Sequence, residues 1–279
     1  MGRAIGVGRR VLAHGDPRWL IVAGGALTGV LAAIAATAGA MVQRLAEAMG
    51  GAGFVVDGLA LWTLLSIRGL ARAAALVAAA LERADLGVAR AALGAHLVSR
   101  EVATLDPAHV ASGAVESVAE NLTDALVAPV CFYLVFGLPG AAAYRLVNTA
   151  DAMIGYRHGV LEHFGKVAAW ADDIANWLPA RLAALALAAA AMLHGGNGAA
   201  AWRAVRRDAR RTASPNAGWT MAAMAGALGR TLHKPGAYQL GTGPLPAVAD
   251  VRRAIGLLYT SAALALAFCV LARLLAGVA

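Results

Sequence analysis

The sequence predicts an all-α, polytopic helical integral membrane protein with four to five apolar spans. Hydrophobic residues make up 60% of the 279 residues and charged residues only 14%, and the mean hydropathy is +0.65. Soluble domains usually carry about 25% charged residues, so this chain is too apolar for that class. The apolar residues also gather in runs long enough to cross or enter a bilayer.

Two apolar runs follow a basic leader. Residues 19–41 are long enough to span a membrane, and four arginines precede them, at Arg3, Arg9, Arg10 and Arg18. An excess of arginine beside a span is typical of the cytoplasmic side, so we expect the leader to lie in the cytoplasm. Residues 54–67 are apolar apart from Asp57. We expect this second run to return to the same side.

The third apolar run, 125–144, contains Gly137-Leu138-Pro139-Gly140 near its centre. A straight helix disfavours glycine and proline there, so the run is either a re-entrant hairpin or a broken span. Residues 178–194 and 255–276 complete the apolar set. With no internal repeat and no separate soluble segment, we expect residues 1–279 to form one helical membrane domain.

The segments between these runs hold most of the charge. We expect residues 68–123, 145–177 and 199–254 to be water-facing, mainly helical, with a loop over 234–250 where prolines and glycines gather. The net charge of +8 comes almost entirely from arginine. The positive-inside rule accounts for this excess, and no nucleic-acid motif accompanies it, so we expect no nucleic-acid partner. The predicted location is the plasma membrane, crossed several times, with a cytoplasmic active site.

Three carboxylates directly precede the third apolar run. Read as a helix, Glu116, Glu120 and Asp124 fall at i, i+4 and i+8 on one face, with Asn121 beside them. Like charges stacked in this way repel each other, so a positive partner is expected against this face. Mg²⁺ is the natural choice because it takes carboxylate and phosphate oxygens. From this stretch alone, a solvated acidic face is an equal alternative.

Two further polar clusters follow within about fifty residues. The first places Tyr144, Asn148 and Asp151 at i, i+4 and i+7 of a helix. The second is formed by Asp172, Asp173 and Asn176, with Arg181 one turn beyond Pro179. Each cluster alone could be a helix-capping pattern. Together the three clusters suit a divalent metal with phosphate oxygens.

Other chemistry finds little support in the sequence. The chain has no GxxxxGK[ST] loop, no GxSxG elbow and no GxGxxG, which argues against a P-loop ATPase or a serine hydrolase. Its seven histidines show no metal-ligand spacing such as HExxH. Cys131 and Cys269 lie in apolar runs, where cysteine behaves as a small hydrophobic residue.

Four linked segments resemble the CobD/CbiB family of adenosylcobinamide-phosphate synthases, which are membrane enzymes of cobalamin biosynthesis. These segments are ESVAENLTDALVAP, YRLVNTADAMIGYR, HFGKVAAWADDIANWLPARL and ASPNAGWTMAAMAGALG. The resemblance covers residue 68 to the C-terminus, and four motifs in order make it specific. It implies an ATP- and Mg²⁺-dependent ligation that joins aminopropanol, or its phosphate, to a propionate carboxylate of adenosylcobyric acid. It also implies contact with other late cobalamin-pathway membrane enzymes.

The resemblance also implies roles for residues of this chain. Catalytic roles fall to Glu116, Glu120, Asp124, Asp151, Asp172 and Asp173, of which Glu116, Glu120, Asp124, Asp151 and Asp173 would hold the metal. Cofactor contacts fall to Asn121, Asn148, Asn176 and Arg181. Substrate contacts fall to Arg68, Arg90, Arg100, Ser214 and Asn216. Arginine suits these contacts because it binds carboxylate and phosphate through two parallel hydrogen bonds.

The N-terminus departs from the family pattern. Family members resemble one another in a first membrane segment that ends in Gly-Asp-Pro and then His-Pro-Val, directly before the basic stretch. Here Met1-Gly2-Arg3 resembles the residues that follow His-Pro-Val, so we expect this first segment to lie upstream or to be absent. If it is absent, the catalytic activity of the chain comes into question.

Two other classes of function were weighed against the ligase. One is a non-catalytic membrane sensor or regulator of the same wider superfamily, similar to the AmpE signalling proteins. The other is an ion-coupled transporter with intramembrane carboxylates. A transporter should carry an internal repeat or paired half-helices, which this sequence lacks. The linked motifs favour the ligase over both.

Overall fold

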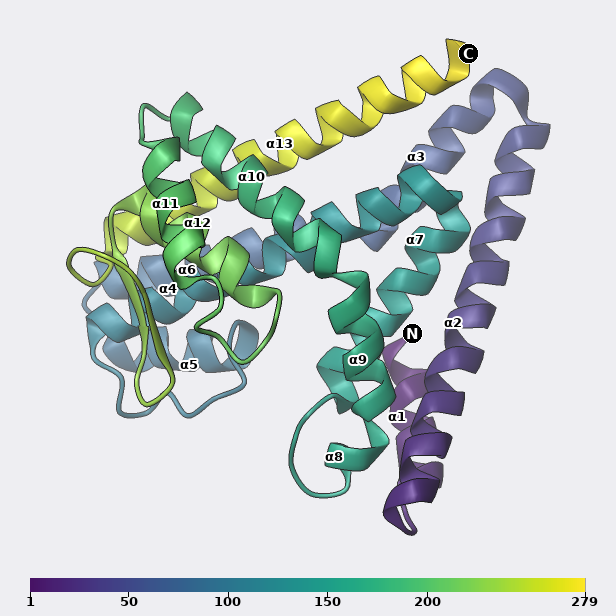
Figure 1. The fold of residues 1–279 in the computed structure, drawn as a ribbon, viewed down its shortest axis with the longest axis horizontal. Coiled ribbons are helices and arrows are strands. Elements are labelled where there is room, and N and C mark those ends of the chain that lie inside the picture. The colour runs from purple at the N-terminus through teal and green to yellow at the C-terminus, as the bar shows by residue number, and fades with distance from the viewer. Residues whose placement is uncertain (279) are drawn as a thin grey trace. The chain divides into compact units, whose positions relative to one another are not determined.

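The computed structural model describes residues 1–278 and is almost entirely helical (Figure 1). Four helical runs are long and apolar enough to cross a membrane, at Pro17–Ala48, Gly50–Glu82, Pro107–Ile154 and Val248–Leu275. Lys166–Ala175 and Trp177–Leu193, taken together as one broken span, would make a fifth. These findings confirm the all-α polytopic class and the expected four to five spans.

The chain divides into two compact units. Unit 1 consists of Met1–Leu65 and Ala128–Asn176, and unit 2 consists of Ser66–Val127 and the residues from Trp177 onward. The sequence predicted one helical membrane domain because it has no internal repeat and no separate soluble segment, and this stays a prediction. The division reflects which helices pack on which, and composition carries no information about that.

Unit 1 is organised around one long helix, α2. Its helices are α1 (Gly2–Leu12), α2 (Pro17–Ala48), the 3₁₀ turn η1 (Gly50–Ala52), α3 (Gly53–Leu64), α7 (Ala128–Ile154), α8 (Leu161–Phe164) and α9 (Lys166–Ala175). Asp16 caps α2 by accepting the backbone N–H groups of Arg18 and Trp19 at 2.9 and 3.0 Å. The other helices of unit 1 pack along α2. Ile5, Leu20 and Phe164 lie in the buried cluster that joins them.

Helix α7 changes direction at Gly137. The backbone there has φ 65° and ψ −159°, a conformation that only glycine adopts readily. Figure 1 shows α7 turning sharply along its length. The side-chain Oε1 of Gln43 on α2 accepts the backbone N–H of Leu138 at 3.0 Å, which satisfies a donor that the break frees. The expected break at 137–140 is therefore present.

Unit 2 is built on the buried helix α6. Its elements are α4 (Ile67–Glu82), α5 (Leu86–His96), α6 (Pro107–Leu122), the π-helical turn η2 (Thr123–Val127), α10 (Trp177–Leu193), α11 (Gly198–Asp208), α12 (Ala217–Leu228), β1 (Thr231–Lys234), β2 (Tyr238–Gly241) and α13 (Val248–Val278). Helix α6 packs against α4, α5, α12, α13 and β1. Every residue from Val110 to Ala119 is buried. This part of the chain therefore differs from the water-facing segment expected over 68–123.

A short hairpin replaces part of the loop expected over 234–250. Strands β1 and β2 pair antiparallel, with Thr231 opposite Gly241 and Lys234 opposite Tyr238. The backbone N–H of Ala237 donates to the Lys234 carbonyl at 3.0 Å, and Gly236 has φ 73°. Proline followed by a positive-φ glycine is the pattern of a type II turn. The turn signal was visible in the sequence, but strands this short carry no clear alternation.

Candidate functional site

Glu116 is the centre of a polar cluster in unit 2. Its Oε1 accepts a hydrogen bond from Ser112 Oγ at 2.8 Å. Its Oε2 accepts from Tyr238 Oη at 2.9 Å and lies 3.2 Å from Arg100 Nη2. The Glu116 side chain is only 5% exposed, and that of Arg100 is 19% exposed. The charge of Glu116 is therefore held by three donors, not by water, so the solvated-face alternative does not describe this residue.

The local structure explains how these donors meet. Ser112 and Glu116 are four residues apart on α6, so their side chains lie one above the other. Gly113 leaves room for Arg100, whose Nη2 would be 3.2 Å from a Cβ built at that glycine. Tyr238 opens β2 and reaches the same carboxylate from the hairpin. Burial and the charge of Glu116 raise the pKa of Tyr238 well above its usual range. Tyr238 is therefore a neutral hydrogen-bond donor at physiological pH.

Glu120 and Asp124 are more open than Glu116. The Glu120 side chain is exposed, and Asp124 is partly exposed. Electrostatic interactions link Glu120 to Glu116, Asp124, Lys234 and Arg100. Asp124 lies in the π-helical turn η2, where one extra residue per turn shifts the face that follows. The three carboxylates thus keep the electrostatic proximity that the i, i+4, i+8 spacing predicted, although the helix is not regular throughout.

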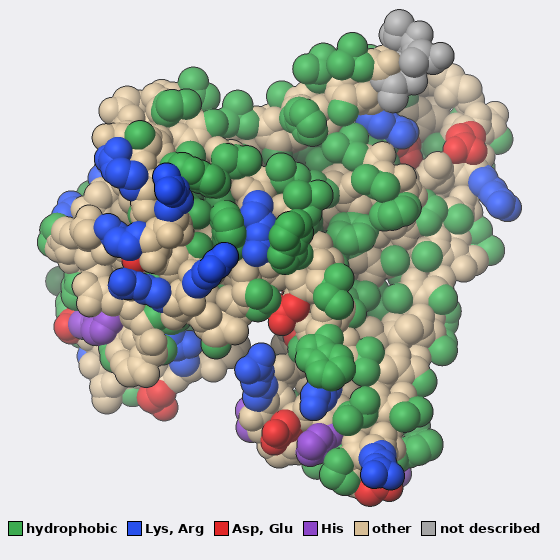
Figure 2. Space-filling view, in the orientation of Figure 1, with side chains coloured by type: hydrophobic (Ala, Val, Ile, Leu, Met, Phe, Trp, Pro, Cys, Tyr) green, Lys and Arg blue, Asp and Glu red, His purple; other side chains and the backbone are tan. Residues whose placement is uncertain are grey.

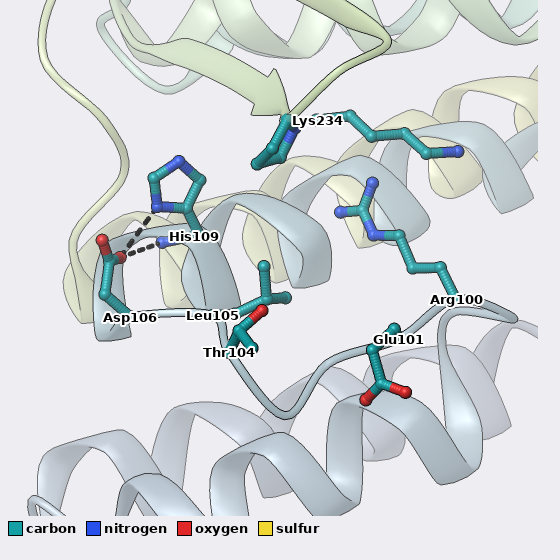
Figure 3. Close-up of a pocket in the computed structure, with 8 residues that line it drawn as sticks. Arg100, Glu101, Thr104, Leu105, Asp106, His109 and Lys234 are labelled. Atoms are coloured by element: carbon teal, nitrogen blue, oxygen red, sulfur yellow. Dashed lines mark hydrogen bonds and ion pairs between the residues drawn. The ribbon is translucent and has the colours of Figure 1, made fainter.

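A cavity of about 440 Å³ lies beside this cluster (Figure 3). The 100–109 segment forms one wall, and the hairpin residues Lys234 and Pro235 form the other. His109 Nδ1 lies 2.9 Å from Asp106 Oδ1, and His109 Nε2 lies 3.0 Å from His233 Nδ1. The backbone N–H of His233 donates to Ser112 Oγ at 2.9 Å. These contacts connect the cavity wall to the Glu116 cluster.

Unit 1 brings together the second and third predicted clusters. Asn148 Nδ2 donates to Asp172 Oδ1 at 3.2 Å, and Asn176 Nδ2 donates to Asp172 Oδ2 at 2.9 Å. Tyr144 Oη donates to Asn176 Oδ1 at 2.9 Å. Asn148, Asp172 and Asn176 are all buried, whereas Asp151 and Asp173 are partly exposed. The i, i+4 face of α7 thus meets the polar face at the end of α9. The spacing had predicted each of these faces, but not their contact.

Arg181 holds a turn in unit 2. Its Nη1 donates to the Trp177 carbonyl at 2.6 Å and to Asn216 Oδ1 at 2.7 Å. Its guanidinium lies between the rings of Trp177 and Trp219, at 4.7 and 4.5 Å from their centroids. Ser214 Oγ accepts the backbone N–H of Asn216 at 3.2 Å. The Ser-Pro-Asn segment therefore forms the turn before α12, and Arg181 fastens it to α10.

The remaining predicted residues are Arg68, Arg90 and Asn121. Arg90 Nε donates to the Leu105 carbonyl at 2.7 Å and so supports the segment that forms the cavity wall. Asn121 Nδ2 donates to the carbonyl of Ser117 at 2.9 Å, one turn earlier on α6. Arg68 is exposed. The roles assigned to these three residues stay predictions.

Four residues of this site were not predicted as functional: Ser112, His109, His233 and Tyr238. Ser112 had a local signal, because it precedes Glu116 by four residues on a helical reading. His109 lies on the same helix, three residues before Ser112, but its contact with His233 forms only through tertiary packing. His233 and Tyr238 carried no local signal, since they meet the cluster only through tertiary packing. Lys234, which lines the cavity, also went unassigned.

A magnesium site was tested against the donor set. Within residues 1–278, no group of three or more His, Cys, Asp or Glu side chains is placed to hold a metal ion. Mg²⁺, however, usually keeps several waters and takes only one or two carboxylates together with substrate phosphates. Glu120 and Asp124 suit that mode better, because Glu120 is exposed and Asp124 is partly exposed. Glu116 suits it less, since Ser112, Arg100 and Tyr238 already occupy its oxygens.

Arginines gather over α11 and the loop that follows it, on the face shown in Figure 2. Two of them pair with buried Asp208: Arg207 Nη2 lies 2.6 Å from Asp208 Oδ2, and Arg211 Nε lies 3.3 Å from Asp208 Oδ1. The backbone N–H of Gly241 also donates to Asp208 Oδ2, at 2.8 Å. Asp208 therefore ties α11 to β2 and helps to position the hairpin.

Comparison with known proteins places these features in a family. A family model described as CobD/Cbib protein matches residues 1–267. A cobalamin biosynthesis protein CobD of Klebsiella pneumoniae is 39% identical over 282 residues, covering 96% of this chain and 87% of that protein. One of Geobacter metallireducens is 42% identical over 253 residues, covering 81% of this chain and 79% of that protein.

A cobalamin biosynthesis protein CobD of Dehalococcoides mccartyi is 46% identical over 187 residues, which cover 67% of this chain and 60% of that protein. The matched region thus spans about three fifths of that relative's length. No solved structure matches the chain. The family model covers nearly all of the sequence, including every residue of the Glu116 cluster and of the Asp172 cluster. The chain belongs to the CobD/Cbib protein family.

Proposed function

We propose that this chain acts in cobalamin biosynthesis as an adenosylcobinamide-phosphate synthase. The observation that carries the proposal is the similarity over residues 1–267 to a family whose relatives are named cobalamin biosynthesis protein CobD. The reaction is an ATP-dependent amide ligation between a propionate carboxylate of adenosylcobyric acid and the amine of aminopropanol or its phosphate. Because ATP is a cytoplasmic substrate, the site would face the cytoplasm from the plasma membrane.

The chemistry sets what the site must provide. A carboxylate is a poor electrophile, so its oxygen first takes the γ-phosphoryl group of ATP and ADP leaves. The amine nitrogen then attacks the acyl carbon, the C–O bond to phosphate breaks with its electron pair on oxygen, and the nitrogen loses a proton. Such a site needs cations for carboxylate and phosphate oxygens, and it needs hard oxygen ligands for Mg²⁺.

The Glu116 cluster offers both kinds of group. Glu120 and Asp124 would hold Mg²⁺, which when bound would offset phosphate charge and orient the transfer. Glu116 acts differently, because it positions Arg100 and Tyr238 beside the cavity. Arg100 then presents its remaining N–H groups to substrate oxygens. In unit 1, Asp151 and Asp173 are the partly exposed carboxylates of the second and third predicted clusters, and they are proposed as metal or nucleotide ligands.

Complementation tests the reaction directly. The chain is expressed in a bacterial strain that lacks its own synthase and depends on corrinoid for growth. We expect growth on added cobyric acid, and we expect Glu120→Gln to abolish it while the protein still reaches the membrane. Glu162→Gln is the matched control, since Glu162 is exposed on α8 of unit 1 and does not line the cavity.

Added cobinamide bypasses the ligation step and shows that the strain can complete the rest of the pathway. Growth on cobinamide without growth on cobyric acid, with the protein present in the membrane, would overturn the proposal. That outcome would favour the alternative of a non-catalytic regulator. A purified-protein assay supports the result if ADP forms only when the corrinoid acid, the amine and Mg²⁺ are all present.

A further inference from the structure

The cavity between the 100–109 segment and the hairpin is lined by carboxylates that already have hydrogen-bond donors and by cations that are less fully paired. Its acidic residues are already engaged. Asp106 Oδ1 accepts both the backbone N–H and the ring Nδ1 of His109, at 2.8 and 2.9 Å. Glu101 Oε1 accepts the backbone N–H groups of Val102 and Ala103. Both carboxylates therefore stabilise the local turn and are not directed at the cations of the cavity.

The cations are less well matched. No carboxylate of the described residues lies within 4.0 Å of the Lys234 ammonium, although Glu120 interacts with it electrostatically from farther away. The ammonium also lies 5.8 Å from the centroid of the Tyr238 ring. Arg100 gives one nitrogen, Nη2, to Glu116. Its buried Nε has no hydrogen-bond partner among the residues described. A buried donor that lacks a partner destabilises the structure, so a ligand that accepts from it is favoured.

The two cations approach one space. Figure 3 shows the Arg100 side chain rising from the 100–109 segment and the Lys234 side chain extending from the end of β1 into the same region. Glu116 pairs with Arg100, and Glu120 interacts electrostatically with both cations, so part of their charge is offset within the protein. An added anion that contacts both cations would reduce the repulsion between them further. The cavity, of about 440 Å³, has room for a small polyatomic anion and the group that carries it. The hairpin is held in place by the His109–His233 and Ser112–His233 hydrogen bonds.

We propose that this cavity is a phosphate-binding site in which Lys234 and Arg100 contact the phosphate oxygens. Lysine supplies a compact charge and arginine supplies directed N–H donors, which together match a phosphate monoester. The phosphate belongs either to the amine substrate or to ATP, and both carry the same terminal group. The assignment of the phosphate to the amine substrate or to ATP rests on the proposed ligation. The binding of a phosphate in this cavity does not rest on it.

Lysine labelling tests the site, because Lys234 and Lys166 are the only lysines of the chain. Both are partly exposed, and Lys166 lies on α9 of unit 1, so it is an internal control. The purified protein is treated with an amine-reactive reagent in the presence of isopropyl phosphate, ATP with Mg²⁺, or acetate. Peptide mass spectrometry reports the labelling of each lysine. Isopropyl phosphate carries the phosphate of aminopropanol phosphate without its reactive amine.

We expect a phosphate ligand to slow labelling of Lys234 at least fivefold and to leave Lys166 unchanged. Stronger protection by isopropyl phosphate assigns the site to the amine substrate, and stronger protection by ATP assigns it to the nucleotide. Protection no greater than that by acetate overturns the proposal. Equal protection of both lysines also overturns it, because that pattern indicates a nonspecific effect of ionic strength.

A matched pair of variants gives a second measurement. Lys234→Gln and Lys166→Gln each remove one charge, and neither lysine has a carboxylate partner within 4.0 Å among residues 1–278. We expect Lys234→Gln to raise the Kd for the protecting ligand about tenfold, as measured by ligand-induced thermal stabilisation, and Lys166→Gln to leave it unchanged. Equal Kd values for Lys234→Gln and the wild type would overturn the site. If binding depends on Lys234 but the chain does not complement the strain, the phosphate site is supported and the proposed ligase activity is contradicted.

Discussion

His109 Nε2 lies 3.0 Å from His233 Nδ1, and this pair joins α6 to β1. On its other side, His109 Nδ1 contacts Asp106. The backbone N–H of His109, together with its ring, holds the pKa of Asp106 below its usual range, so this carboxylate is an acceptor at neutral pH. The Asp106 carboxylate therefore accepts a hydrogen bond from His109 Nδ1, and His109 Nε2 shares a second hydrogen bond with His233 Nδ1. These hydrogen bonds, from Asp106 through His109 to His233, anchor the hairpin that carries Lys234.

Replacing His109 by phenylalanine should loosen the hairpin. The change removes the ring hydrogen bonds to Asp106 and His233, each of which contributes about 0.5–1.5 kcal/mol. We expect the backbone amides of 231–234 and 238–241 to exchange with deuterium several-fold faster, measured by mass spectrometry. His158→Phe, at an exposed position in unit 1, should leave these amides unchanged. Unchanged exchange in His109→Phe would show that the histidine pair does not hold the hairpin.

Asp172→Asn should destabilise the protein, whereas Asp173→Asn should not. Both oxygens of buried Asp172 accept side-chain amide hydrogens from Asn148 and Asn176. An asparagine there turns one acceptor into a donor and leaves a buried donor unpaired, at a cost of about 1–3 kcal/mol. Asp173 is partly exposed, and its replacement should cost at most about 0.5 kcal/mol. Unfolding in detergent measures both.

Activity separates the two positions further. If Asp173 binds nucleotide or metal as proposed, Asp173→Asn should lose ligation while its unfolding midpoint matches that of the wild type. Full activity in Asp173→Asn would remove this residue from the proposed ligand set. A wild-type midpoint for Asp172→Asn would contradict the structural role of the Asn148–Asp172–Asn176 contacts.

The buried carboxylate of Asp208 should make stability depend on pH in the acid range. Burial raises its pKa, but the hydrogen bonds from Arg207 and from the Gly241 N–H outweigh this and leave the pKa below its usual value. A lowered pKa means that the stabilisation is fully present above about pH 4, the unfolded pKa of aspartate, and is lost as the pH falls through the folded pKa. We expect the thermal midpoint of the wild type to fall on acidification below pH 4.

Asp208→Asn should lower the midpoint at pH 7, because hydrogen bonds to a charged group contribute about 1.5–3 kcal/mol. It should also flatten the acid limb of the pH profile. Asp16→Asn is the control, since Asp16 is exposed and asparagine caps α2 equally well. An acid limb in Asp208→Asn as steep as that of the wild type would contradict the assignment.

Gly137→Ala should destabilise the break in α7. The backbone conformation at Gly137 strains any residue with a Cβ by about 1–3 kcal/mol. A Cβ there would also meet the side chain of Gln43, which accepts the Leu138 N–H. Unfolding in detergent should show the loss. Gly29→Ala, where a Cβ meets nothing within 4 Å, should be neutral or slightly stabilising. Equal midpoints for the two variants would mean that the break relaxes without cost.

Local pattern predicted the parts of this protein that local physics controls. Apolar composition and the lengths of the apolar runs predicted a helical membrane protein, because transfer into a bilayer depends on residue type. Gly137 marked the break because its backbone freedom is intrinsic to glycine. The i, i+4 spacing placed Tyr144 with Asn148, and Asp172 with Asn176, on the faces that meet in unit 1. That spacing is a property of any α-helix.

Only the tertiary structure decided which distant residues complete the unit 2 site. Tyr238 reaches Glu116 across 122 residues of sequence, and His233 reaches His109 across 124. No periodic pattern encodes such pairs, because they depend on how α6 and the hairpin pack together. Packing also buried Glu116 and left Glu120 exposed, although both lie on the same predicted face. The sequence therefore determined the helices and their polar faces, and packing determined which charges are paired and which remain open to a ligand.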